Sequence, residues 1–234
     1  MLKAGVLGAG HLGKIHLHIA AASTRYDLVG FYDPDPKTAA SINSSYGYHP
    51  FESPEALIEA CDVVDIVTTA PSHYNLAKLA ASLNISAIIQ KPMAPSLKEA
   101  TKIVDLAETT KTPMMVHENF RFQYPLRVLK KIISNGEIGQ YLFCKISFRT
   151  AYDVYRQQPY LKEVEQLILM DLGVHVLDLV RFLFGEATSI SCRTQKTRSS
   201  RGPQKVSIFK EIIFISSSTL YLTPRNSNRG VCFL

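Results

Sequence analysis

A glycine-rich turn near the start of the chain constrains the fold more than any other feature. The sequence Gly8-Ala9-Gly10-His11-Leu12-Gly13 follows a short apolar run at 3–7 and opens a helical pattern at 11–22. In such a unit the first glycine permits the tight turn, the second lets the backbone approach a pyrophosphate, and the third lets helix and strand pack closely. The helix N-terminus also offers unpaired N–H groups and a positive potential. The motif predicts a dinucleotide-binding βαβ unit; the alternative is a turn that binds nothing.

The first 116 residues alternate apolar runs with helical patterns. Runs typical of buried strands lie at 3–7, 28–32, 63–67, 85–89 and 113–116, and helical patterns lie at 11–22, 36–46, 54–60, 72–83 and 96–109. Ser53 and Ser96 stand where N-caps are expected. Strands that are apolar throughout and alternate with helices indicate a parallel sheet covered on both faces. Right-handed crossovers then give a doubly wound, Rossmann-type α/β domain, which we assign to residues 1–117.

The pattern changes after residue 116. We expect a helix at 124–135, a half-exposed strand at 140–150, a long apolar helix at 166–184 and a strand at 187–194. Gly136 and Gly185 stand just past the two helices, as helix-ending glycines do. This order is typical of an α+β domain, which we assign to residues 118–194. The remaining residues, 195–234, form an atypical tail in which only 209–215 resembles a strand.

The net charge of +6 is confined to the tail. Residues 195–234 hold seven Lys/Arg against one acidic residue and contain no alanine, so the rest of the chain is neutral. We interpret this basic, serine-rich stretch as an out-of-frame or alternative terminus, and we expect no nucleic-acid partner. No apolar run reaches the roughly 18 residues of a membrane span, so we expect no membrane partner either.

The cysteines are scattered and show no pairing motif. Cys61, Cys144, Cys192 and Cys232 form no CxxC pair, so the sequence suggests neither a zinc site nor a disulfide framework. We therefore expect no bound metal and a reducing, cytoplasmic location.

Asp33 stands at the end of the second predicted strand, about 20 residues after Gly13. A carboxylate at this place accepts hydrogen bonds from the adenosine ribose hydroxyls and repels the additional phosphate of NADP. A proline, rather than an arginine, follows it. The sequence favours NAD over NADP; the alternative is that Asp33 only caps the next turn.

Two further groups of residues can carry chemistry. Lys91 follows the predicted strand at 85–89, at the strand end where doubly wound sheets bind ligands, although an isolated loop lysine is more often solvated. Asp171, His175 and Asp178 share one face of the predicted helix at 166–184. Charged groups in an apolar helix need partners or a function, and a histidine is a suitable general base. The alternative is a buried polar cluster with only a structural role.

Together these residues resemble the Gfo/Idh/MocA family of glucose–fructose oxidoreductase, inositol dehydrogenase and their relatives. The glycine motif, Asp33, the Lys91-Pro92 pair and the Asp-x-x-x-His-x-x-Asp helix occur in the order and approximate spacing of that family. Residues 118–122 and 136–139 also resemble family segments. The resemblance covers about 2–194 and implies a Rossmann domain followed by an α+β domain with an open, mostly antiparallel sheet. Because family members are considerably longer, we expect that sheet to be incomplete and the chain to be truncated after about residue 194.

The resemblance implies hydride transfer between a sugar, cyclitol or related polyol and a nicotinamide cofactor. His175 is then the base for the hydroxyl proton, Lys91 stabilises the oxyanion and contacts the cofactor, and Asp171 orients the substrate and tunes His175. The expected cofactor-binding residues are Gly8, Gly10, His11, Leu12, Gly13, Asp33, Thr68, His73, Gln90 and Lys91. The expected substrate-binding residues are Lys91, Arg121, Asp171 and His175. A homo-oligomer formed through the second-domain sheet is a further implication.

The chain departs from the family pattern in two places besides its length. Gln90 stands where the family usually has Glu, which removes a charge beside Lys91. Thr69-Ala70 stands where Thr68 is usually followed by Pro and a polar residue. The alternative function is therefore a truncated, catalytically silent protein that still binds a nucleotide.

Overall fold

The computed structural model describes residues 1–141, 143–148, 161, 167–187, 189–198 and 205–215. The chain divides into two compact units, Met1–His117 and Glu118–Leu234. None of the described helices is both long and apolar enough to span a bilayer.

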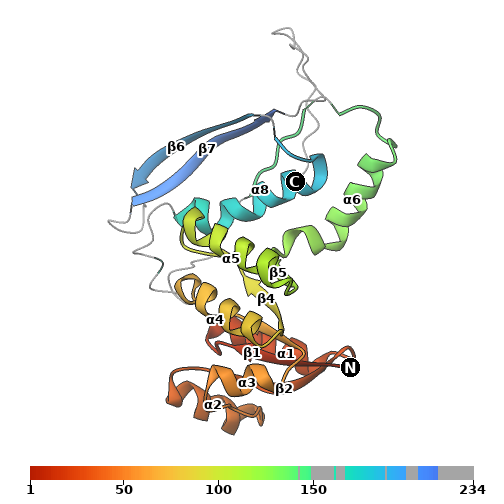
Figure 1. Ribbon diagram of the computed structural model, residues 1–234. Helices are drawn as coiled ribbons and strands as arrows, with labels where there is room; N and C mark the ends of the chain where they lie inside the picture. The colour runs from red at the N-terminus through yellow and green to blue at the C-terminus, as the bar shows by residue number, and fades with distance from the viewer. Residues whose placement is uncertain (142, 149–160, 162–166, 188, 199–204, 216–234) are drawn as a thin grey trace. The chain divides into compact units, whose positions relative to one another are not determined.

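The first unit is a five-stranded parallel sheet with helices on both faces (Figure 1). Its strands are β1 (Leu2–Leu7), β2 (Tyr26–Tyr32), β3 (Val63–Ile66), β4 (Ser86–Gln90) and β5 (Met114–His117), in the order β2-β1-β3-β4-β5. Its helices are α1 (His11–Ala22), α2 (Pro36–Tyr46), α3 (Pro54–Glu59), α4 (Ala70–Ser82) and α5 (Leu97–Thr110). The strand order reverses between β1 and β3, which is where doubly wound sheets bind ligands at the carboxyl ends of the strands. The predicted fold class is confirmed.

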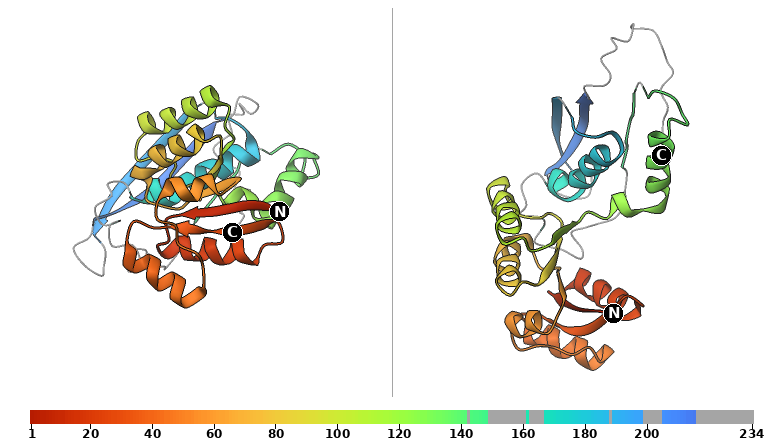
Figure 2. Two further views of the ribbon diagram at one scale, coloured as in Figure 1. Left: turned by 60° about the horizontal axis from the view of Figure 1, so that its bottom comes forward. Right: turned by 45° about the vertical axis from the view of Figure 1, so that its right-hand side comes forward.

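Buried side chains form one layer on each face of this sheet. Between the sheet and α1 and α2 the layer contains Val6, Ala9, Leu17, Phe31, Ile42 and Val67. On the other face, which α3, α4 and α5 cover, it contains Leu7, Leu57, Ile58, Cys61, Val64, Ile66, Ala77, Ala80, Ala87, Ile89, Ala94 and Ile103. Figure 2 shows α4 and α5 side by side on this face. Because neighbouring residues of a strand point to opposite faces, Val6 and Leu7 belong to different layers, and both must be apolar.

Polar side chains begin the helices where the sequence predicted them. Ser53 and Ser96 each accept a hydrogen bond from the backbone N–H three residues further on, which confirms both expected N-caps. Asp35 caps α2 in the same way and also accepts from the hydroxyl of Thr38. The hydroxyl of Thr38 and the backbone N–H of Lys37 hold the pKa of Asp35 below its ordinary value.

The described part of the second unit contains four helical segments and an antiparallel strand pair. Its elements are the 3₁₀ turn η1 (Phe120–Phe122), α6 (Tyr124–Ser134), the π-helical segment η3 (Ile168–Gly173), α8 (Val174–Phe184), β6 (Ser189–Arg198) and β7 (Lys205–Ile215). α8 runs without a break from η3, so the predicted helix at 166–184 is in part π-helical rather than a single α-helix.

Three strand predictions for this unit need correction. The expected strand at 140–150 is irregular at 141 and 143–148 apart from a bridge at Lys145, because alternation of side chains does not by itself supply a pairing strand. The expected strand at 187–194 continues to Arg198, and the expected strand at 209–215 already begins at Lys205. These two strands pair with each other, so the described residues of the tail belong to a sheet.

The glycine turn between β1 and α1 is close-packed at one end and open at the other. Gly8 has a φ of +93°, which favours glycine. A Cβ added at Gly13 would lie only 2.0 Å from the carbonyl oxygen of Gly8. A Cβ at Gly10 would meet nothing within 4 Å among the described residues. The third glycine is therefore needed for packing, whereas the second leaves space above the backbone.

We therefore expect Gly13→Ala to destabilise the protein and Gly10→Ala, as its control, to leave the stability nearly unchanged. The clash at Gly13 involves backbone atoms, so relief requires α1 to shift, at a cost of about 1–3 kcal/mol of unfolding free energy. The Gly10 substitution should change it by no more than about 0.5 kcal/mol. Urea unfolding followed by circular dichroism measures both, and equal midpoints for the two variants would contradict this account of the turn.

Candidate active site

Asp33 ties the glycine turn to the end of β2. Its Oδ2 accepts a hydrogen bond from the Ala9 N–H at 2.7 Å, and its Oδ1 accepts from the Asp35 N–H at 2.9 Å. Asp33 therefore does cap the next turn, but it also fixes the turn expected to hold the pyrophosphate. Each carboxylate oxygen has a second lone pair, so these bonds leave acceptor capacity for a ribose hydroxyl. Contact of Asp33 with the ribose stays a prediction.

The start of α1 fits a dinucleotide pyrophosphate. Gly10 is the N-cap, and no side chain among the described residues caps this helix. The His11 side chain is exposed, and the Leu12 side chain packs against the layer under α1. At the helix start both residues therefore offer their backbone N–H groups, rather than their side chains, to a phosphate. Uncapped N–H groups and the open space above Gly10 are what a phosphate group requires of a helix N-terminus.

Thr68 and His73 lie beside this turn. A Cβ at Gly8 would lie 2.9 Å from the Thr68 backbone nitrogen, so the loop after β3 contacts the glycine turn. His73, which is 1% exposed, has Nε2 at 3.0 Å from the Thr68 carbonyl oxygen and Nδ1 at 3.1 Å from that of Met93. The structure gives His73 a supporting position between two loops. Its direct contact with the cofactor stays a prediction.

Gln90 and Lys91 lie at the carboxyl end of β4. Gln90 is buried, and its Oε1 accepts a hydrogen bond from the Lys91 N–H at 2.8 Å. Lys91 is half-buried, and the Lys91–Pro92 peptide bond is cis. The first unit therefore brings the glycine turn, Asp33, Thr68 and His73 together at the carboxyl ends of the strands. It places Gln90 and Lys91 at the carboxyl end of β4, on the same side of the sheet.

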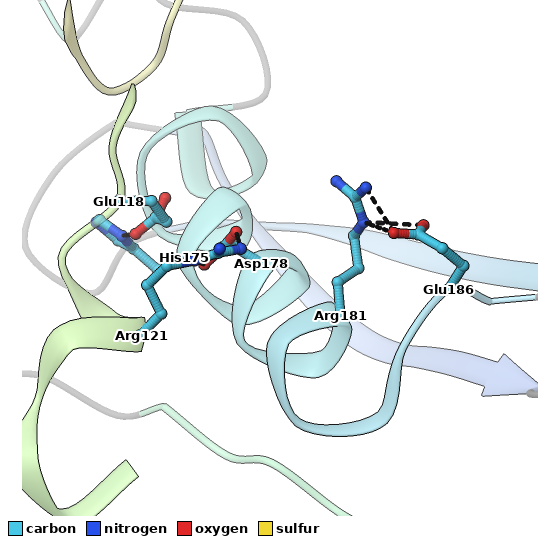
Figure 3. A network of polar contacts seen from close by, with 6 residues as sticks. All are labelled: Glu118, Arg121, His175, Asp178, Arg181 and Glu186. Atoms are coloured by element: carbon cyan, nitrogen blue, oxygen red, sulfur yellow. Dashed lines mark hydrogen bonds and ion pairs between the residues drawn. The ribbon is translucent and has the colours of Figure 1, made fainter. Parts of the chain in front are cut away.

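In the second unit the structure pairs His175 with Glu118 (Figure 3). The imidazole Nδ1 makes a short hydrogen bond to Glu118 Oε1, and both residues are buried. The Phe120 ring stacks on the imidazole with centroids 4.4 Å apart and an interplanar angle of 6°. A carboxylate only accepts, so Nδ1 carries the proton and Nε2 is the basic nitrogen of the neutral ring.

No sequence pattern assigns a role to Glu118. It is 57 positions from His175, so no helical or strand spacing connects the two. The only available signal was the resemblance of residues 118–122, at the start of the second unit, to a segment of the family.

Asp171 lies in η3, directly before the helix that carries His175. It is half-buried. Single π-helical turns within α-helices occur frequently at functional sites, because they widen the helix and re-aim its side chains. The predicted substrate contacts of Asp171 and His175 stay predictions.

Arg121, an expected substrate-binding residue, is bound to Asp178. Its Nε donates to Asp178 Oδ2 at 2.8 Å, and its Nη2 makes a short hydrogen bond to the other oxygen. Hydrogen bonding to Asp178 raises the pKa of Arg121 above its ordinary value. This bidentate pair fixes η1, and thereby Phe120, against α8. Arg181 and Glu186 form a second pair, but both are exposed, so it contributes little stability.

In the part of the chain that the structure describes, no group of three or more His, Cys, Asp or Glu side chains is placed to hold a metal ion. The expected absence of a bound metal stays a prediction.

Family models match both units of the chain. Residues 2–118 match the oxidoreductase family with an NAD-binding Rossmann fold, GFO_IDH_MocA. Residues 126–211 match the GFO/IDH/MocA C-terminal domain. The second match runs past Thr194, near which we expected the resemblance to end.

Curated relatives include sugar dehydrogenases. D-apiose dehydrogenase of Paraburkholderia graminis is 37% identical over 201 residues, which cover 85% of this chain and 54% of that protein. Glucose-6-phosphate 3-dehydrogenase of Bacillus subtilis is 30% identical over 190 residues, which cover 79% of this chain and 54% of that protein. The chain therefore spans about half the length of the curated relatives it matches.

A solved structure supports the same relationship. The crystal structure of an oxidoreductase from Agrobacterium radiobacter in complex with NAD+, L-tartaric acid and magnesium has a TM-score of 0.80 and 32% sequence identity to this chain. The match covers 95% of this chain and 68% of that one. With both family models matched, this chain belongs to the Gfo/Idh/MocA family of oxidoreductases, and its residues 2–118 are an NAD-binding Rossmann domain.

Proposed function

We propose that this protein is an NAD-dependent oxidoreductase that transfers a hydride between a hydroxyl-bearing carbon of a sugar, cyclitol or related polyol and the nicotinamide cofactor. The observation that carries the proposal is the buried pair of Glu118 and His175, because it turns the imidazole into an oriented base. The NAD-binding domain supplies the oxidant's site.

His175 takes the hydroxyl proton in this proposal. Glu118 accepts from Nδ1–H, so Nε2 is the nitrogen that receives the proton, and the carboxylate stabilises the imidazolium that forms. The stacked Phe120 ring holds the imidazole plane. An oriented base loses less freedom in the transition state than a mobile one.

Lys91 provides positive charge for the oxygen that loses its proton. The ammonium group donates to the developing oxyanion, and Gln90 fixes the Lys91 backbone by accepting from its N–H. When bound in the Rossmann domain, NAD would supply the acceptor for the hydride that leaves the carbon atom. Asp171, on the helical turn before His175, orients the substrate.

The substrate class rests on the relatives. Those named D-apiose dehydrogenase and glucose-6-phosphate 3-dehydrogenase act on sugars, and another relative, from Rhizobium meliloti, is named inositol 2-dehydrogenase. We therefore place the substrate of this chain among sugars and cyclitols.

We also propose a reducing, cytoplasmic location and a homo-oligomer formed through the sheet of β6 and β7. Cys61 is a buried free thiol, and Cys144 is also free, as a reducing compartment allows. Cell fractionation tests the location, and analytical ultracentrifugation tests the assembly; a monomer at all concentrations would contradict the second part.

The cofactor preference is tested by fluorescence titration of the full chain with NADH and NADPH. We expect saturable binding with NADH preferred over NADPH. We expect Asp33→Ala to weaken NADH binding about tenfold or more, because it removes an acceptor for the ribose hydroxyls. The same change should reduce the preference for NADH, because it removes a negative charge that repels the additional phosphate of NADPH. Asp27→Ala, at a carboxylate near the other end of β2, is the control. Absence of binding to either nucleotide by the folded chain would contradict the function.

The chemical roles are tested by turnover with NAD and a panel that contains D-apiose, glucose 6-phosphate and myo-inositol. We expect His175→Ala and Lys91→Ala to reduce kcat by about 10²–10⁴-fold while NADH binding stays within about threefold. His18→Ala and Lys102→Ala, at exposed residues of the same types, are the controls. Undiminished turnover in either first variant would overturn its role. Binding without turnover by the unaltered chain would favour the alternative of a catalytically silent protein.

Glu118→Gln tests the orientation of the base. The amide can donate as well as accept, so it no longer selects one tautomer of His175, and we expect kcat to fall by about 10–100-fold with the NADH affinity unchanged. Glu137→Gln, an exposed substitution of the same type, should leave kcat unchanged. A kcat equal to that of the parent protein would show that Glu118 does not orient the imidazole.

A further inference from the structure

A second carboxylate–imidazole pair lies behind Gln90 in the first unit. His16 of α1 contacts Asp65 of β3, with Nδ1 at 2.6 Å from Oδ2. The His16 Nε2 lies 3.4 Å from the Gln90 side-chain nitrogen, and Nδ1 of His117, at the end of β5, lies at the same distance from it. The side chains of His16 and Asp65 are 12% and 22% exposed. Side chains from α1, β3, β4 and β5 thus form one connected polar network between the helix and the sheet.

The hydrogen bonds of this network run in one direction. The Lys91 N–H is only a donor, so the Gln90 Oε1 must face it, at 2.8 Å. The Gln90 NH₂ group therefore points to the two imidazoles, each of which must present an unprotonated nitrogen. His16 meets this condition because its proton is on Nδ1, toward the carboxylate. Asp65 thus selects the tautomer of His16 that can accept from Gln90.

The Asp65 carboxylate depends on His16. Its second oxygen, Oδ1, is buried and has no hydrogen-bond partner among the described residues. Burial of an acceptor without a partner lowers the stability of the folded protein. The hydrogen bond between His16 and Oδ2 offsets part of this cost. Because Asp65 and His16 are hydrogen-bonded to each other, the His16 imidazole stays in place next to the Gln90 side chain.

We propose that Asp65 and His16 are positioning residues that act through Gln90 to hold the backbone of Lys91. Asp65 orients His16, His16 orients the Gln90 amide, and the amide accepts from the Lys91 N–H. The proposal rests on the proposed function for its catalytic consequence, because there the Lys91 ammonium contacts the reacting oxygen. A side chain placed on a held backbone loses less freedom in the transition state.

His16→Asn separates this role from simple filling of space. The asparagine amide can donate to Asp65 from near the place of Nδ1, but it has no atom where Nε2 lies. We expect the Lys91 amide hydrogen to exchange with solvent about tenfold faster, as loss of a typical hydrogen bond permits. We also expect kcat to fall about tenfold with the dissociation constant of NADH within about twofold of the parent value. Gln90→Leu, which removes the acceptor itself, should accelerate the same exchange.

His18→Asn is the matched control, because His18 is an exposed residue of the same helix that hydrogen-bonds to Tyr48. It should leave the exchange of the Lys91 amide and the kcat unchanged. If His16→Asn lowers only the stability of the protein and leaves the Lys91 exchange and kcat as in the parent, His16 has a merely structural role and the proposal is wrong.

The unaltered full chain provides a test that does not depend on any variant. Two-dimensional ¹H–¹⁵N correlation spectra of the imidazoles at neutral pH should show the proton of His16 on Nδ1. Hydrogen-exchange measurements should show that the Lys91 amide is protected from solvent. A proton on Nε2 of His16, or a Lys91 amide that exchanges as fast as an unstructured one, would overturn the proposal. These readouts need no turnover, so an inactive parent chain would count against the proposed function alone.

Discussion

The close approach of α1 to the end of β1 is the contact on which the nucleotide domain depends. Gly13 faces the Gly8 carbonyl at a distance that leaves no room for a Cβ. This approach fixes where α1 starts, and hence where its first N–H groups point. It also carries His16, one turn further along the helix, to Asp65 on β3. One contact between two glycines thus sets both the phosphate cradle and the polar network behind Lys91.

Each unit of the chain contains a carboxylate bound to the Nδ1 atom of a histidine, but the two pairs are surrounded differently. The imidazole of His175 is stacked on Phe120 and is buried with its carboxylate partner, Glu118. The imidazole of His16 instead faces the amide of Gln90. In both pairs the carboxylate decides which ring nitrogen accepts. The first arrangement suits a base for a substrate, and the second suits an internal link in a hydrogen-bonded chain.

The sequence predicts the nucleotide domain well because its signals are local. Apolar runs, the glycine turn and the caps at Ser53 and Ser96 depend on neighbouring residues, and the structure contains all of them. The second unit is predicted less well. The π-helical segment before His175 lies within a pattern that is typical of a single α-helix, and much of the β6–β7 pair lies in the stretch that we interpreted as an atypical tail. Glu118 was missed because its partner lies 57 positions away.

His73 gives the nucleotide domain a mechanical property. Its buried ring contacts the carbonyl of Thr68 in the loop after β3 and that of Met93 in the loop after β4. The loop beside the glycine turn and the loop that carries Lys91 are therefore joined through one rigid ring. Ordering of either loop restricts the other, so a ligand that immobilises the first lowers the entropic cost of immobilising the second. For the oxidoreductase proposed above, such a link predicts that cofactor and substrate bind cooperatively without any change of shape.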